Sequence, residues 1–425
     1  MRHVLPRWNL HNQAATARQV TVLLYLLIFV TAIVQTAIVP LLPDLARVYR
    51  LNPSSAAWLL VLPSVAMLLT STPVGLLGDR IGARSVTLGA GVALCASAFA
   101  QAIPCYAIIF VGRLVFGVAF GAVWTTGLAW LGQVQEGDAS RRLGATVTAA
   151  AVGTALGPAL SGVLASHVGL EAPFIGCGVA VGIVTTLLIC TPATGRGRTP
   201  PTASTSMRRV SHQTRRLPGV AAGAGALAVS GAVGSAVQLL VPLQLNRAGA
   251  SAAEIGLALS SAAVVFIAVS GLVVRLGPRL VNLRVNAWTS VLLTGALIPG
   301  AVSTSSTWLV GMLFLTALPR ATVGTIAYPL ATRHAQAGGL GAGAVIGQLN
   351  GVWAAAMVFA PLAGGLISQF LGFRAAYVAI IILGAAIAVT LLKAQSRHTA
   401  VTDTTPVTTH ETAHPETGNL AAPRR

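Results

Sequence analysis

The sequence predicts an all-α polytopic membrane protein with 12 transmembrane helices in two pseudo-symmetric six-helix bundles. Three observations predict this fold. Only 8% of the 425 residues are charged, and the mean hydropathy is +0.78, whereas soluble domains carry about 25% charged residues. Twelve long apolar runs follow one another along the chain. Motifs of the first half return in the same order in the second half.

Each apolar run has about the 20 residues that a helix needs to cross the hydrocarbon core of a bilayer. Gly and Pro are frequent inside the runs, which membrane helices tolerate better than soluble ones. The regions 86–130 and 285–332 are the hardest to divide into separate helices. The predicted spans are 20–43, 55–77, 86–103, 105–130, 142–166, 173–192, 218–243, 254–274, 285–303, 307–332, 342–367 and 374–393.

The distribution of positive charge predicts the orientation. The net charge of +18 is compatible with a nucleic-acid partner, but its placement argues against one. If both termini are cytoplasmic, 21 of the 27 Lys and Arg residues fall in cytoplasmic segments and 4 in outer segments. This asymmetry follows the positive-inside rule. No cleavable signal peptide is visible, since the run after the polar first 19 residues is long enough to span.

These features predict a multi-pass protein of the plasma membrane with cytoplasmic termini. The richness in Ala, Gly and Arg, with little Lys, is typical of a bacterium of high genomic GC content. Composition further divides the chain, because two Thr- and Pro-rich stretches lack any apolar face. The expected segments are a cytoplasmic N-terminus 1–19, a six-helix bundle 20–192, a cytoplasmic linker 193–217, a second bundle 218–393 and a disordered cytoplasmic tail 394–425.

The internal repeat is carried by three pairs of matching segments at similar offsets. Such a duplicated unit places a substrate site between the halves, near the bilayer midplane. The pairs are 80–84 with 275–279, 195 residues apart, 113–117 with 320–324, 207 apart, and 158–174 with 361–377, 203 apart.

The loop between spans two and three reads Gly75-Leu-Leu-Gly-Asp79-Arg80-Ile-Gly82-Ala-Arg84. It resembles the loop signature G-x-L-x-D-R-x-G-r-r of the major facilitator superfamily. The resemblance implies a tight turn at Gly82 and a charge relay that latches the two halves on the cytoplasmic side and breaks when the transporter opens inward. The alternative is that the arginines only fix the cytoplasmic side of the membrane by the positive-inside rule. That interpretation accounts for Arg84 but gives no reason for an acid at Asp79. The second copy has Val274 at that position.

Span four contains Arg113, and Arg320 is its counterpart in span ten. An arginine near the bilayer centre costs at least ~2.5 kcal/mol, so each should face an aqueous cavity or a partner. The segment Arg113-Leu-Val-Phe-Gly117 resembles the superfamily's fourth-helix motif R-x-x-q-G, with Phe116 in place of the polar residue. The resemblance implies a role in proton coupling. The alternative is a structural arginine bonded to backbone carbonyls.

Span five reads Gly153-Thr-Ala-Leu-Gly157-Pro158-Ala-Leu-Ser161-Gly162. The glycines permit close helix approach, and Pro158 removes a backbone hydrogen bond, which suits a hinge. The string resembles the antiporter signature g-x-x-x-G-P-x-x-G-G-x-l, with Ser161 at one glycine position. It marks the twelve-span drug:proton antiporter family and implies export.

Proton coupling needs a titratable group that the cavity can reach, and none of the nine acids lies mid-span. Asp44, at the outer end of span one, is the acid best placed on a pathway. Arg113 acting with Asp44, exchange of an anionic substrate, and facilitated diffusion all remain open.

A cavity without fixed negative charge favours a neutral or anionic small organic substrate. Polar and aromatic residues within the spans are its candidate contacts, although each alone is equally explained by an interhelical hydrogen bond or by packing. They are Gln35, Thr36, Trp124, Gln238, Arg320, Tyr328, Gln348 and Asn350.

The predicted function is therefore secondary active export of a small organic molecule, by proton antiport with alternating access. The alternative on the same fold is uptake, facilitated diffusion or anion exchange of a metabolite. No metal-ligand cluster, nucleophile or phosphate-binding loop points to an enzyme, a metal or a cofactor. The four cysteines are interpreted as packing residues, and the protein is expected to act as a monomer in the lipid bilayer.

Overall fold

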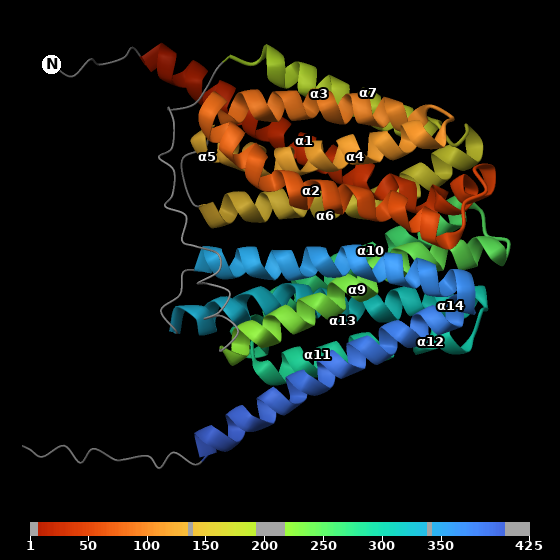
Figure 1. The fold of residues 1–425 in the computed structure, drawn as a ribbon. Helices are drawn as coiled ribbons and strands as arrows, with labels where there is room; N and C mark the ends of the chain where they lie inside the picture. The colour runs from red at the N-terminus through yellow and green to blue at the C-terminus, as the bar shows by residue number, and fades with distance from the viewer. Residues whose placement is uncertain (1–6, 135–138, 193–216, 338–341, 404–425) are drawn as a thin grey trace, which may run out of the picture.

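The computed structural model describes residues 7–134, 139–192, 217–337 and 342–403. The regular structure of these residues is helical throughout. Figure 1 shows two helical bundles lying side by side, the first built from the N-terminal half of the chain and the second from the C-terminal half. The predicted all-α fold is confirmed.

The first bundle contains helices α1 to α7. A short π-helix, η1, joins α4 to α5, so these three form one continuous span. The elements are α1 (Arg7–Val48), α2 (Pro53–Ile81), α3 (Ala83–Ala102), α4 (Tyr106–Ala122), η1 (Val123–Gly127), α5 (Leu128–Val134), α6 (Ala139–His167) and α7 (Ala172–Cys190).

The second bundle begins with α9. Helices α11 and α12 together make one candidate span. The elements are α9 (Pro218–Arg247), α10 (Ala252–Leu276), the 3₁₀ turn η2 (Gly277–Leu280), α11 (Leu283–Gly295), α12 (Ile298–Val302), α13 (Ser306–Ala337) and α14 (Ala342–Asp403).

Eleven stretches among the described residues are long and apolar enough to cross a membrane, and the last of them accounts for two spans. It runs from Val345 to Lys393, 49 residues, which is about 74 Å of helix against a hydrocarbon core of about 30 Å. Gly372 interrupts it with a non-helical backbone (φ 86°, ψ 166°). The chain therefore crosses twelve times, as predicted.

One expected boundary needs correction. Residues 394–403 continue α14 as helix, whereas a disordered tail was expected from residue 394. The helix continues because Pro406 is the first proline after the span, so no residue before it removes a helical hydrogen bond. Helix α1 begins at Arg7 and its apolar stretch runs from Ala15 to Val48, and the cytoplasmic location of residues 1–19 stays a prediction. The expected linker falls almost entirely on 193–216, which lies outside the described residues. The same holds for the two ends of the chain, residues 1–6 and 404–425.

Gly82 forms the tight turn that the loop motif predicts. It links α2 to α3 with φ 97°, and its amide donates to the Gly78 carbonyl. Gly277, its counterpart in the second half, has φ 75° at the end of α10. An L-residue with a side chain is strained at such angles. The repeat therefore preserves a glycine of positive φ at the turn, while ψ differs between the two copies (137° at Gly82 and −160° at Gly277).

The two ends of the molecule differ in how the bundles meet. We call them the Asp44 end, where α1 gives way to α2, and the Asp79 end, where α2 gives way to α3. A shared apolar core includes Leu41 and Leu42 of α1 together with Leu239 and Leu240 of α9. Each bundle also has a core cluster of its own that extends toward the Asp79 end. The bundles are thus joined by common apolar packing at the Asp44 end.

Candidate functional site

Helices α6 and α10 form one seam between the bundles. A methyl group on Gly162 would overlap the Ala252 carbonyl oxygen at the start of α10, so the two helices touch there. The Ala159 amide donates to Ser260 Oγ at 2.8 Å, and the Ala253 amide donates to Ser166 Oγ at 3.2 Å. The segment next to Pro158 thus bonds to the opposite bundle through its backbone.

Helices α2 and α14 form the matching seam. A methyl group on Gly365 would lie 2.8 Å from the Pro53 carbonyl oxygen at the start of α2, and Ser54 Oγ donates to Gln369 Oε1 at 2.7 Å. Gly365 lies 203 residues after Gly162, the offset of the repeat. In both seams a glycine of one bundle rests on the first residue of a helix of the other bundle.

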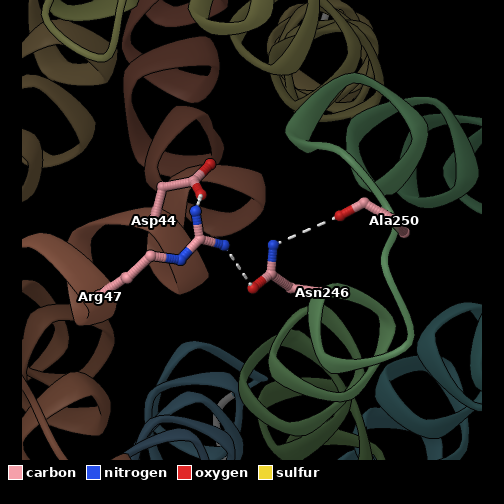
Figure 2. Close-up of polar contacts among 4 residues, drawn as sticks. All are labelled: Asp44, Arg47, Asn246 and Ala250. Atoms are coloured by element: carbon pink, nitrogen blue, oxygen red, sulfur yellow. Dashed lines mark hydrogen bonds and ion pairs between the residues drawn. The ribbon is translucent and has the colours of Figure 1, made fainter.

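A polar cluster joins α1 to α9 at the Asp44 end (Figure 2). Arg47 Nη1 lies 3.3 Å from Asp44 Oδ1, and Arg47 Nη2 donates to Asn246 Oδ1 across the bundle interface at 3.0 Å. Asn246 Nδ2 in turn donates to the Ala250 carbonyl at 3.3 Å. Asp44 therefore belongs to the closure at this end, through Arg47.

A cavity of about 300 Å³ lies between the bundles, deeper than these contacts. Helices α1 and α6 of the first bundle and α9, α10 and α13 of the second line it. Three of the predicted substrate contacts, Thr36, Gln238 and Arg320, share this lining. Phe266, Thr154 and Thr316 join them and were not predicted, because nothing in an apolar run indicates which of its residues face inward.

Of the described residues that line the cavity, one is charged, and it is Arg320. Its guanidinium carbon lies 5.3 Å from the centroid of the Phe266 ring. On another side it lies close to Gly234 of α9, where a Cβ would be 3.1 Å from that carbon. Within the described residues Arg320 has no hydrogen-bond or ion-pair partner. It is held by an aromatic face and by a glycine that leaves room for it.

Arg113 lies in a different environment from its counterpart. It is fully buried inside the first bundle, Nε donates to the Leu59 carbonyl of α2 at 2.8 Å, and the guanidinium carbon lies 5.2 Å from the Phe116 ring centroid. It does not line the cavity between the bundles. The structure matches the alternative interpretation, an arginine bonded to a backbone carbonyl, and proton coupling through Arg113 stays a prediction.

The remaining predicted cavity residues lie elsewhere. Tyr328 donates to Asn350 Oδ1 at 2.6 Å within the second bundle. Gln35, Trp124 and Gln348 each hold a buried polar atom that has no hydrogen-bond partner among the described residues. None of the five lines the cavity. Their roles as substrate contacts stay predictions.

The loop motif lies at the Asp79 end. Asp79 and Arg80 are exposed, and within the described part of the chain Asp79 has no ion pair. Arg84 instead folds back on its own bundle, where Nη2 donates to the Thr191 carbonyl at 2.6 Å. Gly75 packs within the same bundle, where a Cβ would lie 3.6 Å from Thr125. The predicted latch through Asp79 stays a prediction.

The glycines of the span-five motif bring α6 against α1. A methyl group on Gly153 would overlap the Phe29 carbonyl oxygen, and one on Gly157 would overlap Thr36 Oγ1. Pro158 lines the cavity and lies inside an unbroken α6. The motif therefore fixes α1, with Thr36, at the cavity wall.

A larger hollow of about 660 Å³ lies within the first bundle between α1, α6 and α7. Ser161 and His167 are the polar residues among the described residues of its lining, and the others are apolar. It has no contribution from the second bundle. The cavity between the bundles has more groups that can orient a ligand, including Arg320 and Gln238, and both halves line it, so we assign the site to that smaller cavity.

Comparison with known proteins agrees with this architecture. The sequence model of the Major Facilitator Superfamily matches residues 24–349, well over half of the chain. The multidrug efflux pump LfrA of Mycolicibacterium smegmatis is 30% identical over 169 residues, which are 39% of this chain and 33% of that protein. The match thus spans a third of the length of this curated relative.

Two solved structures show the same fold at low sequence identity. A bacterial homologue of the human lysosomal transporter Spinster, in an inward-facing unoccupied conformation, superimposes with TM-score 0.71 at 14% identity, over 90% of this chain and 96% of that one. A variant of the nucleoside transporter NupG gives TM-score 0.70 at 9% identity, over 88% and 99%. With the family match and the cavity between two six-helix bundles, the chain belongs to the Major Facilitator Superfamily.

Proposed function

We propose that this protein exports a small organic molecule across the plasma membrane by alternating access, coupled to proton antiport. The observation that carries the proposal is the cavity between the bundles, together with the two seams that close it toward the Asp44 end. The cavity lies beneath the contacts of the Asp44 end. Rocking of one bundle against the other would open those seams and expose the same cavity to the opposite side.

Export, rather than uptake, is supported by two features. The span-five string resembles the signature of drug:proton antiporters, and its Gly162 lies in the seam that has to open. The partial relative LfrA is described as an efflux pump. The substrate is expected to be neutral or anionic, because the cavity lining contains Arg320 and no acid among its described residues.

Uptake, facilitated diffusion or anion exchange is the second candidate function. Arg320 favours anion exchange among these, because an anion exchanger needs a positive group in its cavity and does not need a proton carrier. Asp44, the acid best placed on a pathway, lies at the closure and does not line the cavity. The nucleoside transporter and the Spinster homologue share the fold, so the fold itself does not discriminate between the two.

A transport assay in proteoliposomes tests the proposal. The purified protein is reconstituted with a pH-sensitive dye inside, a pH gradient is imposed, and neutral, anionic and cationic compounds are added in turn. Substrate-dependent proton movement supports antiport. Substrate flux without proton movement favours the second candidate, and absence of flux for every compound contradicts both.

The proposed orientation puts the Asp44 end outside and both termini in the cytoplasm. Two native cysteines test it, because Cys105 is exposed between α3 and α4 at the Asp44 end and Cys190 is exposed at the far end of α7. Variants that keep one of the two are treated with a membrane-impermeant maleimide in intact cells. We expect labelling of the Cys105 variant and protection of the Cys190 variant. Labelling of the Cys190 variant with protection of the Cys105 variant would show the opposite orientation in the membrane.

A further inference from the structure

We propose that Arg320 is the anion-binding residue of the central cavity, and that the transported molecule combines an anionic group with an apolar body. The inference rests on the proposed transport function and narrows its substrate from neutral or anionic to anionic. The site is built from Arg320 and Phe266, with Gln238 and Thr36 as neutral hydrogen-bonding groups in the same lining.

The first argument is the cost of the charge. A guanidinium at mid-membrane depth costs at least ~2.5 kcal/mol unless a partner compensates it. Among the described residues Arg320 has neither an ion pair nor a hydrogen bond, and the cavity lining holds no acid. The Phe266 ring, at 5.3 Å, is its described electrostatic partner. An aromatic face compensates a cation only partly, so an anion in the cavity is the missing partner.

The second argument is accessibility. Arg113 occupies the matching place in the repeat, yet its guanidinium is sealed in the first bundle against the Leu59 carbonyl. Arg320 is partly exposed and lines the cavity. The glycine at position 234 lets the guanidinium lie against α9, because a side chain there would meet it. The fold thus keeps this charge where a ligand can reach it.

The third argument concerns the rest of the ligand. Apart from Arg320, Gln238 and the threonines, the described lining is aliphatic or aromatic, with Phe266, Leu259 and Leu313 among its members. Apolar walls with few polar groups bind the apolar part of a ligand and orient its polar group. A guanidinium presents its donors in a planar fork that matches a carboxylate, sulfonate or phosphate. An aromatic or aliphatic acid fits both features.

Binding measured by calorimetry on the full-length protein in nanodiscs tests the inference. The probes are naphthalene-2-sulfonate, which stays ionised at neutral pH, naphthalene-2-sulfonamide, which is neutral, and a naphthylmethyl-trimethylammonium cation. We expect wild type to bind the sulfonate about 10-fold or more tightly than the neutral and cationic probes, because a charge-assisted hydrogen bond is lost in those.

Three variants locate the effect. Arg320→Gln should abolish the preference for the sulfonate, and Arg320→Lys should retain most of it because the charge remains. Arg374→Gln removes an equal charge from an exposed position outside the cavity and should bind as wild type. Unchanged binding of naphthalene-2-sulfonamide by Arg320→Gln shows that its loss of the preference is not a failure to fold.

Several outcomes would overturn the inference. Equal sulfonate affinity in wild type and Arg320→Gln would do so, as would tighter binding of the neutral or cationic probe, or no binding of the sulfonate. Displacement of the sulfonate by millimolar chloride would assign the anion to an inorganic co-ion instead of the substrate. The proposed transport function fails separately, when no compound of any charge moves in the proteoliposome assay.

Discussion

The fourth helix of one bundle and its repeat in the other carry the same residue in two environments. Arg113 is enclosed between α4 and α2 and bonded to a carbonyl. Arg320 lies at the cavity between the bundles, against Phe266 and Gly234. Gln35 and Gln238 diverge in the same way, since they are 203 residues apart and only Gln238 lines the cavity. The two halves keep the same residues at matching positions, whereas packing against the neighbouring helices decides which copy lines the cavity.

The largest expected difference is between Arg320→Gln and Arg113→Gln. The first should weaken binding of naphthalene-2-sulfonate about 10-fold or more, because it removes the charge at the cavity. The second should change that affinity by less than about 2-fold, because Arg113 does not line the cavity and bonds to Leu59 inside the first bundle. Calorimetric titration of both purified variants checks this. Comparable losses in the two would remove the distinction between the copies.

The next comparison concerns the two seam glycines. Gly162→Ala should hinder closure more than Gly365→Ala, because its added methyl overlaps the Ala252 carbonyl, whereas the methyl at 365 lies 2.8 Å from the Pro53 carbonyl. We expect Gly162→Ala to shift the protein several-fold, relative to Gly365→Ala, toward conformations that are open at the Asp44 end. Maleimide accessibility of a cysteine placed at Ser260, inside the α6–α10 seam, measures it. If the two variants behave alike, the seams are equivalent.

Asp79→Asn tests whether the loop motif acts in one half only. Transport should fall severalfold while membrane insertion stays normal, because the acid of the predicted latch is lost. Val274→Asn places the same amide at the equivalent exposed position of the second copy and should leave flux near that of wild type. Counterflow in proteoliposomes, with insertion checked by protease digestion, measures both. Wild-type flux from correctly inserted Asp79→Asn would refute the latch.

The smallest expected effect is at the polar cluster of Figure 2. Arg47→Gln removes an exposed ion pair with Asp44 and the bond to Asn246. Exposed pairs contribute about 0–1 kcal/mol, so we expect a change of less than about 5-fold in the open-to-closed ratio, measured by the same cysteine accessibility. A complete loss of closure would make this cluster, and not the glycine seams, the main contact between the halves.

The sequence predicted the twelve crossings, because each span must satisfy its own backbone and therefore appears as a long apolar run. It also predicted the turn at Gly82, since a motif glycine at a helix boundary indicates a backbone that other residues disfavour. Three members of the cavity, Thr36, Gln238 and Arg320, were found as polar residues in apolar helices.

The rest depends on packing that a single sequence does not encode visibly. Phe266 lies within the apolar run Ala262–Val269 of α10, so its own neighbours do not mark which of them face inward. Arg113 and Arg320 have similar local sequences, and their difference arises from contacts with α2 in one case and with α9 and α10 in the other. The helical residues 394–403 carry no apolar face, and α14 simply continues through them.

The glycine seams have a consequence for the response of the protein to its medium. At the Asp44 end the bundles meet through carbonyl contacts, hydroxyls, amides and shared apolar surface, with Arg47 as an exposed ionic contribution. Mobile ions screen exposed charges over a Debye length of about 8 Å at physiological ionic strength, but they do not weaken van der Waals contacts. Closure at this end is therefore expected to depend little on the salinity of the medium that this end faces. Beyond the small contribution of Arg47, we expect any dependence of transport on ionic strength to arise from the arginine-rich Asp79 end or from the proposed anionic substrate at Arg320.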